Sequence, residues 1–329
     1  MLQGGGEVFF LRSDETFKKP VCFPQAMTFT ITVLGTSSMV PTKERNVQAF
    51  LIEYNGELIL LDCGEGTQRQ MNIAGYSRAK VRKVLLTHWH GDHVGGLIGL
   101  IQTIFNSEYQ HTLHIYGPKG SETRLEHLRK TVDFENPVDI EVHELTPGRE
   151  EEQVVVENDE YRILCMPMRH GTPTIAYAFI EKEKRRIDVA KAEKLGLKTG
   201  PVMGRLQRGE TVTFKGKTIK AEEVTYVRPA KKVVFIPDTT LTNEIPMLAE
   251  GADLMICEST YGNEHESKAH EYKHLTAAQA ALLAQQAGVK KLVLTHFSQR
   301  YTTVDHLLEE ARIHFPPTEV AHDFLKINV

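Results

Sequence analysis

Short apolar runs bounded by polar, glycine or proline residues recur along most of the chain. Runs of this length that are rich in Val, Ile, Leu and Phe predict β-strands. The predicted strands cover residues 28–34, 48–53, 57–61, 113–116, 140–145, 154–156, 161–166, 232–236, 253–257 and 291–295. Longer segments of mixed polarity predict helices up to about residue 105, at 121–130 and at 277–287. Because strands and helices alternate without a linker rich in Pro, Gly or Ser, the pattern predicts one α/β domain.

Two segments depart from this pattern. Residues 1–26 offer neither a signal-peptide core nor a periodic element, so we expect an N-terminal extension outside a domain of residues 27–329. The second departure is at residues 181–212, where residues 182–198 alone hold seven Lys and Arg against three Asp and Glu. The apolar residues among these charges suffice for a short helix but not for a core.

A basic run of this kind is most often a solvated surface helix. The chain as a whole carries a net charge of −4, so a local excess of positive charge stands out against it. Lys and Arg gathered in one segment are the electrostatic footprint of a site for nucleic-acid phosphates. We therefore interpret residues 181–212 as an inserted arm that contacts phosphate backbones.

Composition places the chain among ordinary soluble proteins, with 41% hydrophobic and 25% charged residues in 329. No apolar segment approaches the length needed to span a bilayer, so no membrane partner is expected. The four cysteines are widely separated and form no C-x-x-C pair. This usage indicates reduced thiols and a cytoplasmic protein.

The densest chemistry lies in His88-Trp89-His90-Gly91-Asp92-His93, which follows an apolar run predicted to be a strand ending at Thr87. Side chains two apart in extended chain leave on the same side, so His88 and His90 are able to bind one ion. Asp92 and His93 are then free to face a second. Imidazole nitrogen with a carboxylate oxygen suits zinc, and also manganese or iron, better than calcium or magnesium. A lone histidine in a loop usually only forms hydrogen bonds, but this density and order favour a metal site.

The order H-x-H-x-D-H after an apolar strand resembles the signature of the metallo-β-lactamase superfamily of binuclear hydrolases. The resemblance implies a four-layer αβ/βα sandwich with the metals at the edge between two sheets. It also implies three further ligands, His, Asp and His, each at the end of a strand. His170, Asp238 and His296 follow the predicted strands 161–166, 232–236 and 291–295 in that order.

Carried over by position, the resemblance implies two Zn²⁺ ions per subunit, with Mn²⁺ or another divalent ion as an alternative. One ion would be held by His88, His90 and His170, and the other by Asp92, His93 and His296, with Asp238 bridging. Asp62, which ends the strand at 57–61, has two open interpretations. It either serves the turn that follows or orients a metal-binding histidine.

Further blocks resemble one family within this superfamily, the tRNase Z endonucleases that trim 3′ trailers from precursor tRNA. Pro41-Thr42-Lys43-Glu44-Arg45-Asn46 matches the family's P-x-K-x-R-N loop, and Gly200-Pro201 behind a basic arm resembles its GP-containing exosite. His274-Leu275-Thr276 and the block 296–301 resemble two more family blocks, with Phe297 and Gln299 as departures in the last one. The likeness covers residues 27–329 at the length of the short form.

The family resemblance implies roles and partners. Asp92 would accept a proton, and His274, oriented by Glu258, would donate one to the departing oxygen, leaving a 3′-hydroxyl on the tRNA and a 5′-phosphate on the trailer. The enzyme would be a homodimer in which the arm of one subunit serves the active site of the other. Residues expected to contact the substrate are Lys43, Arg45, Lys184, Arg185, Arg186, Gly200, Pro201, Ser298, Arg300 and Tyr301.

Three alternatives remain open from the sequence. His274 could be a histidine satisfied near a helix start. The chain could be a different binuclear hydrolase that acts on a small ester or phosphodiester, in which case turnover would not depend on the arm. It could also be an RNA-binding protein with an idle metal site, although competent residues occupy every expected ligand position.

Overall fold

Two seven-stranded sheets form the centre of the computed structural model, which describes residues 29–105, 111–133 and 139–329. The expected extension at residues 1–26 lies outside the described residues. The first sheet has the order β20-β1-β3-β4-β5-β6-β7. Its strands are β1 (Phe29–Gly35), β3 (Ala49–Tyr54), β4 (Glu57–Leu61), β5 (Val81–Leu85), β6 (Leu113–Pro118), β7 (Ile140–Leu145) and β20 (Lys326–Asn328).

The second sheet has the order β19-β17-β16-β15-β10-β9-β8. Its strands are β8 (Gln153–Glu157), β9 (Tyr161–Met168), β10 (Thr174–Glu181), β15 (Lys232–Ile236), β16 (Leu254–Glu258), β17 (Leu292–Thr295) and β19 (Thr318–Val320). A short parallel pair, β2 (Ser37–Ser38) with β18 (Phe297–Ser298), joins the N-terminal half of the chain to the C-terminal half.

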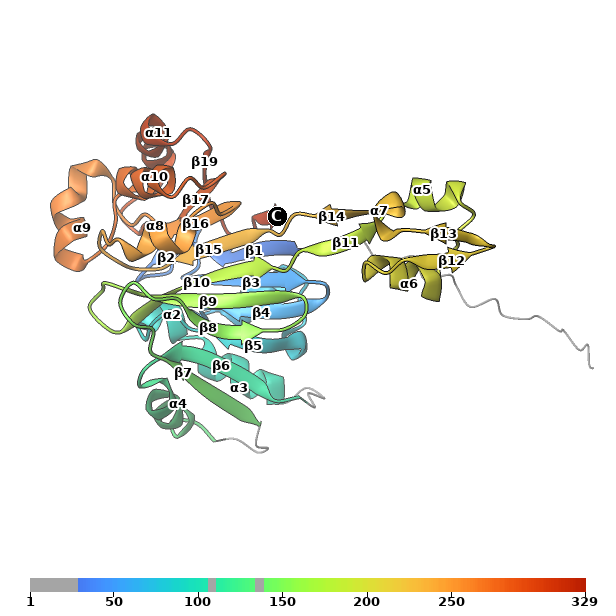
Figure 1. Cartoon of the computed structure of the whole chain (residues 1–329). Helices are drawn as coiled ribbons and strands as arrows, with labels where there is room; N and C mark the ends of the chain where they lie inside the picture. The colour runs from blue at the N-terminus through green and yellow to red at the C-terminus, as the bar shows by residue number, and fades with distance from the viewer. Residues whose placement is uncertain (1–28, 106–110, 134–138) are drawn as a thin grey trace, which may run out of the picture.

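Helices cover the outer face of each sheet, so the molecule has four layers, as the superfamily resemblance predicts (Figure 1). The first sheet is covered by α1 (Thr67–Ile73), α3 (Leu97–Phe105) and α4 (Ser121–Arg129), with α2 (Gly91–Val94) and a 3₁₀ turn (Arg78–Lys80) between strands. The second sheet is covered by α8 (Glu244–Ala249), α10 (Ala277–Gln286) and α11 (Asp305–His314), with a 3₁₀ turn (Asn263–His265) and α9 (Glu266–Tyr272) beside them. Within the described residues, no helix is long and apolar enough to cross a membrane.

The core between the sheets is built by alternate side chains of the facing strands. Aromatic rings dominate one end of it, where Tyr54, Tyr161 and Phe179 pack with ring centroids 4.6–5.5 Å apart. All three side chains are buried. This rigid interface fixes the relation between the two sheets, and hence between the loops that leave their edges.

The loops that leave one edge of the sandwich bring the predicted ligands together. Strands β4 to β7 run parallel in the first sheet, and β15, β16, β17 and β19 run parallel in the second. Carboxyl ends of parallel strands share one edge of their sheet, which is where α/β proteins place their sites. The segments after β5, β15, β16 and β17 contain the ligand motif, Asp238, Thr260 and His296.

A separate unit projects from the sandwich between β10 and β15 (Figure 1). Its stem pairs β11 (Lys184–Ile187) with β14 (Thr225–Arg228), and its distal part contains α5 (Val189–Lys194), α6 (Pro201–Gln207), β12 (Val212–Phe214), β13 (Lys217–Ile219) and α7 (Ala221–Val224). The distal part has its own small core, which includes Leu197, Leu206 and Val224. The unit therefore continues past residue 212, the end predicted for the arm, to Arg228.

The start of this unit also differs from the prediction. Residues 184–187 are a strand rather than part of a helix, because they pair with residues 225–228, about 40 positions later in the chain. The local pattern of charge and polarity does not predict a pairing between segments so far apart in the sequence. The helix begins only afterwards, at Val189–Lys194, where the Asp188 side chain accepts a hydrogen bond from the Lys191 amide as an N-cap.

Candidate metal centre

The ligand motif turns sharply as it leaves β5. His90 precedes α2, so Asp92 and His93 lie in the first turn of that helix. The turn packs against Gly64, where a Cβ atom would lie 2.3 Å from the main-chain oxygen of Asp92. Only glycine allows this approach, which explains why the Asp62-Cys63-Gly64 segment lies directly beneath the motif.

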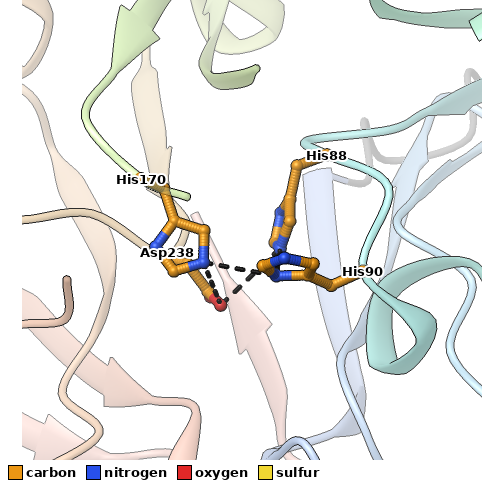
Figure 2. Close-up of side chains that lie close together, drawn as sticks. All are labelled: His88, His90, His170 and Asp238. Atoms are coloured by element: carbon orange, nitrogen blue, oxygen red, sulfur yellow. Dashed lines mark hydrogen bonds and ion pairs between the residues drawn. The ribbon is translucent and has the colours of Figure 1, made fainter. Parts of the chain in front are cut away.

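The first ligand group contains His88, His90, His170 and Asp238 (Figure 2). The Nδ1 atom of His90 lies 3.0 Å from His88 Nε2 and 3.2 Å from His170 Nε2. Asp238 Oδ2 lies 3.6 Å from His88 Nε2 and 3.7 Å from His170 Nε2. Three imidazole nitrogens and one carboxylate oxygen thus converge on one point.

The second group contains Asp92, His93 and His296, all buried. His296 Nε2 lies 3.3 Å from His93 Nε2 and 3.3 Å from Asp92 Oδ2. The other oxygen of Asp238, Oδ1, lies 3.4 Å from His93 Nε2 and 3.3 Å from His296 Nε2. The two oxygens of Asp238 therefore face the two groups, one each.

These residues fit the metal ions that the superfamily implies. Asp238 Oδ1 is buried and accepts no hydrogen bond from any residue that the structure describes, an arrangement that is costly unless a cation satisfies it. Metal–ligand bonds of about 2.0–2.2 Å place neighbouring ligand atoms about 3.3 Å apart in a tetrahedral site, which is close to the spacing in both groups. Five imidazoles and two carboxylates form the donor set of a zinc-like ion rather than of calcium or magnesium.

Electrostatics in this buried cluster keep its carboxylates charged. Burial acts to raise the pKa of Asp92, but His93 and His296 hold it well below its ordinary value. The pKa of Asp238 is likewise held low against burial, chiefly by His296 and His93. Burial lowers the pKa of His88, and its neighbour His93 adds to that effect, so the His88 ring stays neutral.

Asp62 is the partner of His93, which supports the second of the two interpretations given to it. Its Oδ2 atom accepts a hydrogen bond from His93 Nδ1 at 2.7 Å, which leaves Nε2 of that ring facing the second group. Asp62 also has a φ of 56°, so it serves the turn as well. Both roles that were open from the sequence are thus present in one residue.

His274 lies beside the two groups, 4.0 Å from Asp238 Oδ2. Its Nδ1 atom lies 3.1 Å from Oε1 of Glu258, a fully buried carboxylate at the end of β16. Burial alone would lower the pKa of His274, but Glu258 first, and then Asp238, raise it to about 9. The ring is therefore a cation at neutral pH, oriented by Glu258 as the family resemblance implies.

Two contacts to the ligands come from the main chain and were missed by the sequence analysis. The Met39 amide donates to Asp92 Oδ2 at 2.8 Å, and the Lys273 carbonyl accepts from His170 Nδ1 at 2.9 Å. Both residues have positive φ, 61° at Met39 and 58° at Lys273. Main-chain groups carry no side-chain signature, so residue types gave no signal for either contact.

The residues expected to contact substrate near the site differ in their surroundings. Tyr301 is 8% exposed, and its hydroxyl accepts from the Gly262 amide and donates to Glu264. Arg45 donates to the Tyr301 carbonyl, so this pair ties the loop of residues 41–46 to the C-terminal block. Lys43 and Arg300 are exposed, and Arg300 donates to the mostly buried Ser298 hydroxyl.

In the arm, the predicted phosphate contacts at residues 184–186 lie in the stem. Lys184 pairs with Glu160, and Arg185 donates to the Thr225 hydroxyl at 3.0 Å. Gly200 and Pro201 begin α6. The exposed arm lysines without an ion pair among the described residues are Lys194, Lys198, Lys215, Lys217 and Lys220. The last three lie beyond residue 212, where the sequence pattern had placed the end of the arm, so they were not among the predicted contacts.

Models of two related families match the chain. Residues 42–171 match the metallo-beta-lactamase superfamily and residues 222–297 a beta-lactamase superfamily domain. The ribonuclease Z of Methanothermobacter thermautotrophicus is 44% identical over 300 residues, which are 91% of this chain and 96% of that protein. The chain belongs to the ribonuclease Z family.

Other ribonuclease Z sequences are also similar to this chain. That of Archaeoglobus fulgidus is 38% identical over 92% of this chain and 98% of its own length. Among solved structures, the short form of human tRNase Z is similar, with 26% identity, a TM-score of 0.68, and coverage of 91% of this chain and 98% of that chain. Membership of the ribonuclease Z family thus accounts for the order of ligands and for the four layers.

Proposed function

We propose that this chain is a metal-dependent endoribonuclease that removes the 3′ trailer from precursor tRNA. Cleavage would leave a 3′-hydroxyl on the tRNA and a 5′-phosphate on the trailer. The observation that carries the proposal is Asp238, whose two oxygens face two separate ligand groups. It stands in a chain that matches a ribonuclease Z over 91% of its length.

Two divalent ions, zinc in the first instance and manganese as an alternative, are the cofactors that this donor set suits. His88, His90 and His170 would hold one ion, Asp92, His93 and His296 the other, and Asp238 both. When bound, such a pair supplies a water with lowered pKa and neutralises charge on the phosphate under attack.

The chain's own residues move the protons. Asp92, kept ionised by His93 and His296, is the proposed proton acceptor. His274 is the proposed donor, because its pKa of about 9 keeps a proton on the ring at neutral pH. Glu258 holds Nδ1–H of His274, so the proton on Nε2 is the one available to the departing 3′-oxygen.

The rest of the molecule supports RNA binding. Residues 184–228 contain twelve Lys and Arg against five Asp and Glu in a chain of net charge −4, which suits an arm that grips the tRNA body. Lys43 and Arg300 are the proposed phosphate contacts nearer the metal centre. We place all of residues 27–329 in one nuclease domain, in a cytoplasmic homodimer whose arms serve the partner's active site.

Incubation of zinc-loaded protein with a precursor tRNA that carries a 3′ trailer tests the proposal. We expect one cut near the discriminator base, lost in Asp92→Ala and retained in Asp159→Ala, a matched change at an exposed carboxylate between β8 and β9. Hydrolysis of a small phosphodiester without any cut in the tRNA would overturn the assignment of precursor tRNA as the substrate. Tight RNA binding by fully loaded protein without hydrolysis of either would instead identify a non-catalytic binding protein.

A further inference from the structure

The hydroxyl of Thr260 lies between a buried carboxylate and a proposed metal ligand. Its Oγ1 atom donates to Glu258 Oε2 at 2.8 Å and lies 2.9 Å from Nδ1 of His296. A hydroxyl has a single proton, and here the carboxylate takes it. Nδ1 of His296 must therefore carry its own proton and donate to Thr260, which leaves Nε2 on the side of Asp92 and Asp238.

Thr87 occupies the equivalent place in the other half of the site. Its Oγ1 atom donates to Asp62 Oδ2 at 2.9 Å and lies 3.0 Å from Nδ1 of His88. The Thr87 amide fixes the same carboxylate through Oδ1 at 2.8 Å. By the same count of protons, Nδ1 of His88 donates to the hydroxyl, and Nε2 is free for the first ligand group.

The two arrangements match in a further respect. Each buried carboxylate contacts one imidazole directly, since Asp62 accepts from His93 and Glu258 accepts from His274. Each reaches a second imidazole only through the threonine. Two carboxylates thereby orient four rings, and neither threonine is itself one of the proposed metal ligands.

We propose that Thr87 and Thr260 are positioning residues whose hydroxyls hold His88 and His296 in the tautomer that can bind metal. The inference rests on the metal centre proposed above. Without the hydroxyl, a buried Nδ1–H would lose the acceptor that it has among the described residues, and the ring would gain by moving the proton to Nε2. An Nε2–H cannot donate a lone pair to an ion, so loss of the hydroxyl weakens metal binding even where the ring stays in place.

Thr260→Val tests this inference, because valine keeps the shape and removes the hydroxyl. Thr260→Ser is the rescue variant. Thr295→Val is the matched control, since Thr295 is also buried, directly precedes His296, and has a hydroxyl without a hydrogen-bond partner among the described residues. Zinc affinity of metal-free, full-length protein would be measured by competition with a chromophoric chelator, after circular dichroism has verified folding.

We expect Thr260→Val to weaken zinc binding about 10- to 100-fold, the usual cost of losing a partner of a metal ligand, and Thr260→Ser and Thr295→Val to bind as the parent does. Long-range ¹H–¹⁵N spectra of the metal-free protein read the tautomer directly. They should show His296 protonated at Nδ1 in the parent and in Thr260→Ser, but not in Thr260→Val. Parental affinity and an unchanged tautomer in Thr260→Val would overturn the inference.

Thr87→Val and Thr87→Ser repeat the test at His88. If Thr87→Val fails to fold because Asp62 loses a partner, the Thr260 variants still decide the matter. None of these measurements involves RNA, so a wrong substrate assignment would leave their outcome intact. Equal loss of zinc binding in every variant and in the Thr295→Val control would count against a positioning role of the Thr87 and Thr260 hydroxyls.

Discussion

His170 and Lys273 are joined by a hydrogen bond between a ring and the main chain, with His170 Nδ1 2.9 Å from the Lys273 carbonyl oxygen. The turn between α9 and α10 therefore orients one proposed ligand, while its next residue, His274, is the proposed acid. Lys273 holds this position with a φ of 58°, in the left-handed region that glycine adopts without strain.

Replacement of Lys273 tests whether this carbonyl matters. Lys273→Gly should retain zinc binding, because glycine accepts the same backbone conformation. Lys273→Val should destabilise the metal-free protein by roughly 1–2 kcal/mol and weaken zinc binding, since a left-handed backbone is costly for a residue with a Cβ and worse for a branched one. Urea unfolding and chelator competition measure the two effects. Parental zinc affinity in Lys273→Val would show that the carbonyl contributes nothing.

Asp238→Asn should remove metal from both ligand groups, because each oxygen of Asp238 faces one of them. An amide keeps the shape but presents one neutral oxygen and one N–H. We expect metal content after dialysis to fall at both positions, with affinity reduced by at least about 100-fold. Asp159→Asn, an exposed control, should keep the parental content by inductively coupled plasma mass spectrometry. Loss of only one ion would mean that Asp238 does not bind both ions.

Glu258→Gln should lower the pKa of His274, since Glu258 is the largest influence that raises it. The folded-state pKa of about 9 exceeds the ordinary value of about 6.5, so the imidazolium favours folding. That contribution is complete below about pH 6.5 and is lost as the pH rises through 9. Titration of the His274 Cε1–H resonance in metal-free protein measures the shift. An unchanged midpoint in Glu258→Gln would refute the assigned cause.

The exposed arm lysines should act on tRNA affinity through charge. Lys217→Ala should weaken tRNA binding and reduce the slope of log affinity against log salt by about 1, the expected effect of losing one phosphate contact. Lys80, the last residue of the 3₁₀ turn before β5, is exposed, and Lys80→Ala serves as the control. Hydrolysis of a small phosphodiester should be unaffected in both. An equal loss of tRNA affinity in the two variants would mean that overall charge, and not the arm, is responsible.

The ligand motif was predictable because its residues are adjacent and each has a distinctive chemistry. His170, Asp238 and His296 could be assigned because each follows an apolar strand in the order that the superfamily resemblance demands. The family comparisons confirm that resemblance, and the structure brings all seven residues together. The two-sheet, four-layer arrangement followed from the resemblance, since a strand pattern alone does not specify how sheets pair.

The misses share a physical cause. Thr260 and Lys273 act through contacts set by packing, and neither residue type marks such a role in a sequence. The bounds of the arm and its first strand were not predicted, because the strand at 184–187 forms by pairing with residues 225–228. The pattern of charges also did not indicate the β12–β13 hairpin between these two segments. Arg45 donates to the Tyr301 carbonyl, a contact that its residue type did not indicate, and its contact with phosphate stays a prediction.

The ligand groups draw on both halves of the chain. The first half supplies His88, His90, Asp92 and His93, and the second supplies His170, Asp238 and His296, from loops at the edges of the two sheets. A chain with one sheet formed would present an incomplete set of donors to an ion. We therefore expect metal uptake to be a late event in folding, and bound metal should hold the halves together by stabilising only the fully assembled state.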